Sequence, residues 1–242
     1  MQVEAGLEPF QFKQFKVEHD RCMARVGTDA VVLGAWADCK GAERILDIGT
    51  GSGVIALMLA QRNAKAEVVG VEIDAEAASQ AKDNFLYSPW ADRVSCNCTD
   101  VQTFARNTEE RFDLAVCNPP FFSGGSHNNG GASRLAMRTA KKLPHGDLLS
   151  AFRTLLTDTG KAVVVLPYIE GLRFSELARS YGLYPVRILQ LRPEDEQPIE
   201  RLIIQLERKR MEPIRFDLVM NYEGGEPTRQ FKRLTKAFYT EF

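Results

Sequence analysis

The chain has 242 residues, of which 44% are hydrophobic and 26% are charged. This composition is that of a globular protein, and it excludes a disordered chain and a fibrous repeat. There are 31 lysine and arginine residues against 32 aspartate and glutamate residues, so the net charge is −1. A protein that binds nucleic acid through bulk positive charge is therefore excluded, and any basic surface must be local.

Neither a membrane segment nor a secretion signal is expected. No stretch approaches the roughly 20 uncharged apolar residues of a membrane helix, and the N-terminus lacks the basic start and apolar run of a signal peptide. The five cysteines form no CxxC pair, and the three histidines have no partner at the spacing of a hydrolase triad or a metal site. We expect a cytoplasmic monomer that binds neither a membrane nor a metal.

Short β-rich apolar runs alternate with helix-compatible stretches from residue 44 onward. Predicted strands cover residues 44–48, 66–73, 93–97, 112–117 and 161–167, and predicted helices cover residues 54–62, 75–87, 101–106 and 146–156. Parallel strands need a crossover connection between them, and helices of this length supply one. The alternation therefore predicts an α/β fold, with a mostly parallel sheet and helices on both of its faces.

The chain after Pro167 departs from this alternation. A helix is predicted over residues 170–181, and two apolar runs follow at 184–191 and 201–208. The linker between these runs is too short for a helical crossover, so we expect them to form an antiparallel pair that closes the sheet.

The two ends of the chain carry apolar residues of their own. The first 40 residues are rich in phenylalanine and valine, and we expect them to pack onto the sheet. Near the other end, Phe231, Leu234 and Phe238 recur at helical spacing, with basic residues on the opposite side that are expected to face solvent. No break in composition indicates a second domain, so one domain is predicted.

A glycine-rich turn follows the first predicted strand, in the segment DIGTGSG at residues 47–53. Glycines let the backbone approach a ligand closely, and the helix that follows presents unpaired N–H groups. A plain strand-to-helix turn would also use glycine. The dinucleotide fingerprint G-x-G-x-x-G needs its third glycine one residue beyond Gly53, so this spacing disfavours a nicotinamide oxidoreductase.

Acidic residues follow the next two predicted strands. Glu72 ends the second strand, where it can accept hydrogen bonds from ribose hydroxyls, and Asp100 follows the third. Because the carboxyl ends of parallel strands meet at one edge of the sheet, these acids and the glycines are expected to share a ligand there. Taken singly, Asp74 and Asp100 are also typical helix caps.

The most specific motif is Asn118-Pro119-Pro120-Phe121, directly after the fourth predicted strand. Here the sequence resembles the class I S-adenosylmethionine-dependent methyltransferases that modify planar exocyclic nitrogens. An amino group on a purine ring is a poor nucleophile because its lone pair is delocalised. The Asn118 side-chain carbonyl and the Pro119 main-chain carbonyl can hold its two hydrogens, while the prolines remove competing donors. Phe121 or Phe122 can stack on the base.

A long segment without a predicted helix or strand follows this motif. It contains no acidic residue between Leu114 and Gly146, yet it carries four basic residues, Arg134, Arg138, Lys141 and Lys142. Loops of this length are commonly functional, and these side chains are suited to contacts with RNA phosphates. The alternative is a solvated loop.

The whole chain resembles a narrower family, the bacterial tRNA adenine-N6 methyltransferases that modify the adenosine 3′ of the anticodon in valine tRNA. The resemblance includes the blocks at 12–19, 25–29 and 33–36 and the aromatic ending. It implies a Rossmann-like sheet of seven strands with one antiparallel strand, and S-adenosylmethionine as cofactor. It also implies that Gly27, Thr28 and Asp29 lie by the methionine end of the donor.

The motifs and the resemblance together predict one methyltransferase domain, with an N-terminal cap segment at 1–40, a catalytic core at 41–210 and a C-terminal strand and helix extension at 211–242. The predicted catalytic residues are Asn118, Pro119, Pro120 and Phe121. The predicted substrate-binding residues are Phe121, Phe122, Arg134, Arg138, Lys141 and Lys142. The predicted donor-binding residues are Gly27, Thr28, Asp29, Asp47, Gly49, Thr50, Gly51, Gly53, Glu72, Ile73, Asp100, Val101 and Asn118.

Three alternatives remain open at this point. Related enzymes with NPPF methylate guanine N2 in ribosomal RNA, and related enzymes with NPPY methylate glutamine in release factors. A cofactor-binding RNA chaperone without catalysis is a different class of protein, and the intact motif weighs against it.

Overall fold

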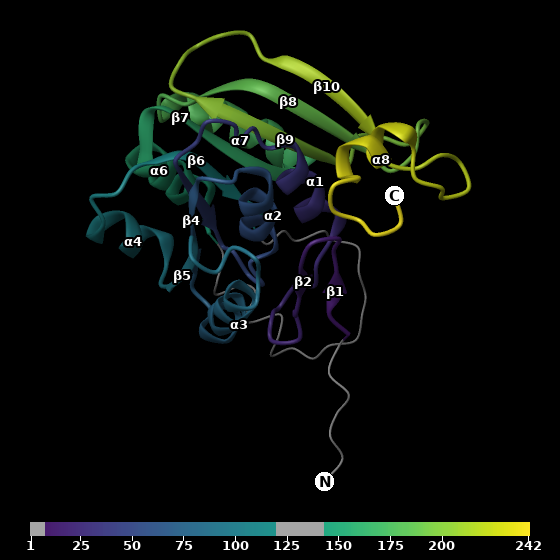
Figure 1. Ribbon diagram of the computed structural model, residues 1–242. Coiled ribbons are helices and arrows are strands. Elements are labelled where there is room, and N and C mark those ends of the chain that lie inside the picture. The colour runs from purple at the N-terminus through teal and green to yellow at the C-terminus, as the bar shows by residue number, and fades with distance from the viewer. Residues whose placement is uncertain (1–7, 120–142) are drawn as a thin grey trace, which may run out of the picture.

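The computed structural model describes residues 8–119 and 143–242, and its centre is a twisted sheet of eight strands (Figure 1). The strands are β3 (Arg44–Ile48), β4 (Glu67–Glu72), β5 (Val94–Cys98), β6 (Phe112–Cys117), β7 (Leu156–Pro167), β8 (Tyr184–Arg192), β9 (Arg201–Glu207) and β10 (Ile214–Val219). They lie in the order β10-β8-β9-β7-β6-β3-β4-β5. Strand β9 runs antiparallel to both of its neighbours, and the other pairs are parallel. The predicted fold class and the antiparallel pair are confirmed.

The predicted count of seven strands is wrong, because β10 adds an eighth strand at the edge of the sheet. It pairs in parallel with β8, from Ile214 opposite Arg187 to Val219 opposite Arg192. The first four residues of β10 are exposed. Residues 214–218 alternate apolar and charged side chains, as expected for a strand, and they lie within the predicted C-terminal strand and helix extension. Leu218 joins the first buried cluster.

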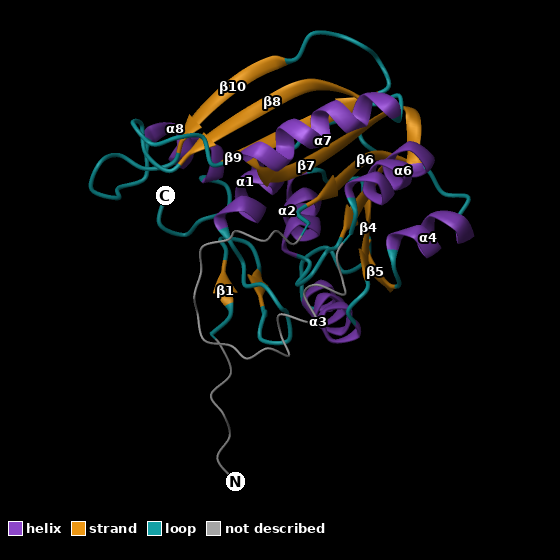
Figure 2. Cartoon of the chain, turned by 180° about the vertical axis from the view of Figure 1, so that it is seen from behind, coloured by secondary structure: helices purple, strands orange, loops and turns teal. Residues whose placement is uncertain are grey.

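Helices cover both faces of the sheet (Figure 2). They are α1 (Thr28–Trp36), α2 (Val54–Arg62), α3 (Ala75–Leu86), α4 (Val101–Asn107), α6 (His145–Leu155), α7 (Tyr168–Ser180) and α8 (Arg229–Thr235). Side chains from α1, α2 and α3 join one buried cluster, and those from α4, α6 and α7 join another. Successive strand residues alternate between the clusters: in β7, Val163 and Val165 face the first, and Val164 faces the second. This alternation follows from the strand pleat.

The N-terminal and C-terminal segments pack against each other beside the sheet (Figure 1). Strands β1 (Phe10–Gln11) and β2 (Lys16–Val17) form a short antiparallel hairpin. Phe12 forms an isolated β-bridge with Tyr239, and both Phe12 and Phe238 are buried. Val31 and Leu33 of α1 share the first cluster with sheet residues. The expected packing of the first 40 residues onto the sheet is therefore confirmed for the residues described.

The helix α8 follows the spacing that the sequence predicts, although it ends at Thr235. Phe231 is buried and Leu234 is half-buried, while Arg229 and Arg233 on the other side are exposed. Within residues 8–119 and 143–242, no helix is both long enough and apolar enough to cross a membrane.

Candidate functional site

A cavity of about 460 Å³ lies where the parallel strands end. Its size is typical of a small-molecule site, and ligands of open α/β sheets bind at this edge. Eight residues of the predicted site line it, each at the end of β3, β4, β5 or β6 or within three positions after it. These are Gly49, Gly51, Glu72, Ile73, Asp100, Val101, Asn118 and Pro119. The structure brings these eight residues together at one edge of the sheet.

The three glycines of the turn after β3 serve different purposes. All three have positive φ, at 69° for Gly49, 54° for Gly51 and 83° for Gly53. A Cβ on Gly49 or Gly51 would meet no atom within 4 Å, whereas a Cβ on Gly53 would lie 2.3 Å from the Phe85 ring on α3. Gly49 and Gly51 therefore leave their backbone open to the cavity. Gly53 allows α3 to pack against the turn, and it does not line the cavity.

Glu72 joins the ends of two strands. One carboxylate oxygen accepts the Gly51 N–H at 3.0 Å, and the other accepts the Asp74 N–H at 2.9 Å. A carboxylate offers about four acceptor positions, so each oxygen retains one for a ligand. Glu72 thus both fixes the glycine turn and presents acceptors to the cavity.

Asp47 lies beneath the turn and does not line the cavity. It is fully buried, and its Oδ2 accepts from the Thr50 hydroxyl at 2.7 Å and from the Ala56 N–H at 3.2 Å. Its Oδ1 is buried without a hydrogen-bond partner. Burial raises the pKa of Asp47 to about 7, against the lowering effect of those two hydrogen bonds. Asp47 and Thr50 therefore shape the turn from within.

The buried carboxyl of Asp47 makes stability depend on pH. Between its ordinary pKa of 3.8 and about 7, the native protein retains a proton that the unfolded chain has released. Because the native state binds more protons in this window, the free energy of unfolding falls as pH rises from about 4 to 7. Asp47→Asn retains an acceptor for Thr50 and does not titrate. We expect it to gain stability relative to wild type as pH rises, as measured by urea unfolding at pH 5 and pH 8. The same difference in unfolding free energy between the variant and wild type at both pH values would contradict this expectation.

Asp74 and Asp100 are helix caps that also line the cavity. Asp74 Oδ1 accepts the Glu76 and Ala77 N–H groups at the start of α3. Asp100 Oδ1 accepts the Thr103 N–H at 2.7 Å at the start of α4, and this hydrogen bond lowers the pKa of Asp100. Each of these two residues therefore caps a helix and lines the cavity. Asp74 was not among the predicted site residues.

Gly27, Thr28 and Asp29 lie at the start of α1, and none of them lines the cavity. Gly27 is the residue before the helix, and Thr28 is its first residue. The Asp29 carboxylate forms an ion pair with Arg201 of β9 at 3.0 Å. This ion pair links α1 to the antiparallel strand β9.

Asn118 and Pro119 directly follow β6, and both line the cavity. Asn118 is half-buried and Pro119 is buried. The other residues predicted for catalysis and RNA binding lie outside the described residues: Pro120, Phe121, Phe122, Arg134, Arg138, Lys141 and Lys142.

One wall of the cavity was not predicted from the sequence. Cys22, Met23 and Ala24 line it from the segment between β2 and α1. They follow no strand of the central sheet and share no motif with the other lining residues. No local sequence signal therefore points to them.

Comparisons with known proteins agree with this geometry. The methyltransferase small domain family matches residues 27–157, more than half of the chain. A tRNA1(Val) (adenine(37)-N6)-methyltransferase of Trichodesmium erythraeum is 40% identical over 239 residues, which cover 98% of this chain and the whole of the relative. A protein of the same name from Flavobacterium psychrophilum is 38% identical, over 95% of this chain and 98% of that one.

Two solved structures share the fold at low sequence identity. A predicted O-methyltransferase from Agrobacterium tumefaciens has a TM-score of 0.65 at 20% identity, over 87% of this chain and 96% of that one. P. horikoshii TYW2, solved in complex with MeSAdo, has a TM-score of 0.55 at 14% identity, over 83% of this chain and 71% of that one.

The sheet order and the cavity at its carboxyl edge define a class I methyltransferase, an enzyme whose methyl donor is S-adenosylmethionine. The relatives that match nearly the whole chain at 38–40% identity identify the family within this class. The chain belongs to the family of the tRNA1(Val) (adenine(37)-N6)-methyltransferases.

Proposed function

We propose that this protein transfers the methyl group of S-adenosylmethionine to N6 of the adenosine 3′ of the anticodon in valine tRNA. The observation that carries the reaction is the position of Asn118 and Pro119, which line the same cavity as the glycine turn and Glu72. The observation that supports the substrate is the name shared by relatives that match nearly the whole chain.

The residues of the cavity fit the proposed donor. Glu72 has acceptor positions left for the two ribose hydroxyls, and the apolar side chains of Ile73 and Val101 provide walls for an adenine ring. The open backbone at Gly49 and Gly51 allows close approach of the ligand. When bound, the donor supplies an electrophilic methyl group on a positively charged sulfur.

Asn118 and Pro119 have the chemistry to prepare the acceptor nitrogen. The side-chain carbonyl of Asn118 and the main-chain carbonyl of Pro119 accept the two hydrogens of the exocyclic amine. Held in this way, the nitrogen gains tetrahedral character, and its lone pair turns out of the ring plane toward the cavity. Because these acceptors bind more strongly as the nitrogen becomes tetrahedral, they stabilise the transition state more than the ground state.

The RNA contacts in this proposal come from residues beyond the described part of the chain. Phe121 stacks on the base that leaves the anticodon loop, and the basic residues between Arg134 and Lys142 contact phosphates. We also infer a cytoplasmic location, where the proposed tRNA substrate is found. The monomeric state and the lack of a metal stay predictions.

Methylation of separated substrates tests the proposed function. The protein and labelled S-adenosylmethionine are incubated with valine tRNA, ribosomal RNA or release factors, and the product is identified by mass spectrometry. We expect N6-methyladenosine in valine tRNA only. A valine tRNA transcript with guanosine at the target position is the matched control and should stay unmodified. Methylated guanine in ribosomal RNA or methylated glutamine in a release factor would overturn the substrate.

Replacing Glu72 tests the donor site. Glu72→Ala removes the carboxylate that lines the cavity and releases the Gly51 N–H, so we expect donor affinity to fall by about 1.5–3 kcal/mol, the range for hydrogen bonds to a charged group. Glu72→Gln retains one oxygen acceptor and should lose less. Calorimetry with S-adenosylmethionine measures both variants. An Ala variant with wild-type affinity would mean that Glu72 does not hold the ribose.

A further inference from the structure

Residues 18–26 contribute one wall of the cavity through their middle residues. This segment, here named the strap, connects β2 to α1 and contains no helix or strand. Its middle residues, Cys22, Met23 and Ala24, line the cavity. Because the strap has no regular backbone hydrogen bonding of its own, its position depends on contacts with other elements.

A buried amide on α3 holds the middle of the strap. Gln80 is fully buried, and its Oε1 accepts both the Arg21 N–H at 2.9 Å and the Cys22 S–H at 3.2 Å. Its Nε2 donates to the carboxylate of Asp20. A buried amide is costly unless it is hydrogen-bonded, and here strap residues use both ends of the Gln80 amide.

A second buried amide, one helical turn later, holds the start of the strap. Asn84 Oδ1 accepts the Glu18 N–H at 3.0 Å, and Asn84 Nδ2 donates to the Glu18 carbonyl at 2.8 Å. The same Nδ2 also donates to the carbonyl of Ser52 at 2.8 Å, within the glycine turn. Residues four apart on a helix share one face, so both amides point toward the strap. Asn84 therefore connects the strap directly to the glycine turn.

A third contact lies at the surface. The guanidinium of Arg21 reaches the Asp83 carboxylate at 2.5 Å and the Ser79 hydroxyl at 3.2 Å, both on α3. This pair is partly exposed, and exposed ion pairs contribute little to stability. The buried amides are therefore the main anchors of the strap.

We propose that the strap is a preorganised wall of the methyl-donor cavity, and that Gln80 is a positioning residue that sets donor affinity through Cys22 and Met23. The proposal rests on the proposed function only in taking S-adenosylmethionine as the ligand. A wall fixed before binding spares the ligand the entropy cost of ordering nine residues. Removal of the Gln80 anchor transfers that cost to the binding step, so donor affinity falls while the chemistry at Asn118 is unchanged.

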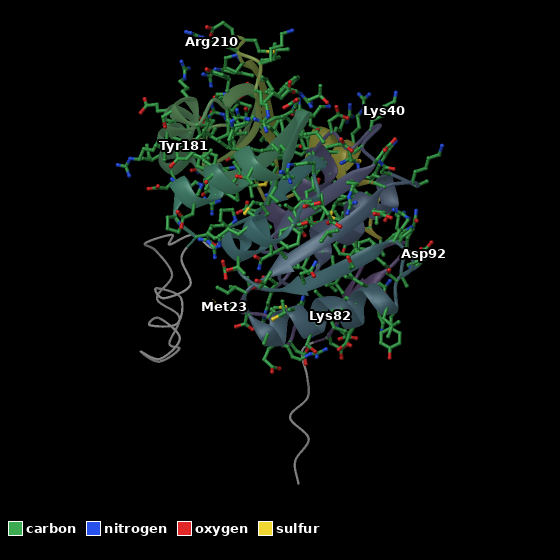
Figure 3. The ribbon with its side chains drawn as sticks, turned by 90° about the vertical axis from the view of Figure 1, so that its left-hand side faces the viewer. Met23, Lys40, Lys82, Asp92, Tyr181 and Arg210 are labelled. Atoms are coloured by element: carbon green, nitrogen blue, oxygen red, sulfur yellow. The ribbon has the colours of Figure 1, made fainter. Side chains whose placement is uncertain are left out.

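Gln80→Met tests this proposal, since methionine has a similar length and makes no comparable hydrogen bonds. We expect the Kd and the KM for S-adenosylmethionine to rise about tenfold, the effect of losing roughly one net hydrogen bond, with kcat at saturating donor unchanged. Lys82→Ala is the matched control, because Lys82 is exposed on the same helix (Figure 3). A Gln80→Met protein that binds the donor with wild-type affinity would overturn the proposal, and so would a fall in kcat alone.

Two further measurements do not depend on the folding of that variant. In the wild-type protein without ligand, the Glu18 and Arg21 amides, which donate to Asn84 and Gln80, should already exchange slowly, and S-adenosylmethionine should change their exchange little. Fast exchange that slows only when the donor binds would contradict a wall fixed before binding. Met23 is 48% exposed and lines the cavity, so Met23→Ala should fold normally and bind the donor more weakly. These readouts need only donor binding. A wild-type protein that binds the donor without methylating tRNA would therefore refute the proposed substrate. The strap proposal would still be tested by the binding and exchange measurements.

Discussion

Asn118→Ala is expected to lower kcat on valine tRNA by a factor on the order of 10²–10³, the usual loss when one well-aimed polar group at a transition state is removed. The variant loses the side-chain carbonyl that holds one hydrogen of the amine. The glycine turn and Glu72 remain, so the Kd for S-adenosylmethionine should stay near that of the wild type. Because the lost interaction strengthens as the nitrogen becomes tetrahedral, the effect falls on kcat rather than on donor binding.

Asn118→Asp is the matched variant for this experiment. It retains an oxygen acceptor at the same position. We therefore expect it to retain more activity than the Ala variant. Single-turnover methylation of valine tRNA, with donor binding measured in parallel, separates the two steps. An Ala variant that methylates at the wild-type rate would refute the mechanism, and one that merely fails to bind the donor would assign Asn118 to the donor site alone.

Gly53→Ala is expected to destabilise the protein by about 2–5 kcal/mol, the sum of left-handed backbone strain and overpacking. The new Cβ would lie 2.3 Å from the Phe85 ring, and φ at this residue is 83°. Phe85 is buried in the cluster beneath α3, so the ring has little room to withdraw. Urea unfolding measures the loss. In the Gly53→Ala background, Phe85→Leu should recover part of it, because the smaller side chain relieves the contact.

Gly51→Ala is the matched control in the same turn. Its φ is also positive, at 54°, yet a Cβ there would meet no atom within 4 Å. We expect only the backbone strain of about 1–2 kcal/mol, together with weaker donor binding, because the methyl group would enter the cavity. Equal losses of stability in the two variants would contradict the assignment of Gly53 to packing and Gly51 to the ligand.

The sequence alone was sufficient for features that depend on neighbouring residues. Crossover length and strand periodicity predicted the parallel sheet, and the short linker before β9 predicted the antiparallel pair. Residues that end a parallel strand or directly follow it had to meet at one edge, so Gly49, Glu72 and Asn118 could be placed around one cavity. In each case the determining interaction acts within one strand, one turn or one crossover. A pattern of neighbouring residues in the sequence can therefore predict it.

Only the tertiary structure decided which of these residues face the ligand. Spacing treats Gly51 and Gly53 alike, and the ring of Phe85, over 30 positions away, separates their roles. Asp47 has the right residue type for the site, yet its buried contacts with Thr50 and Ala56 turn it beneath the glycine loop. The strap carries no motif because its position is set by amides on α3, about 60 residues later in the chain. Such contacts join distant segments, and no local pattern records which segments will meet.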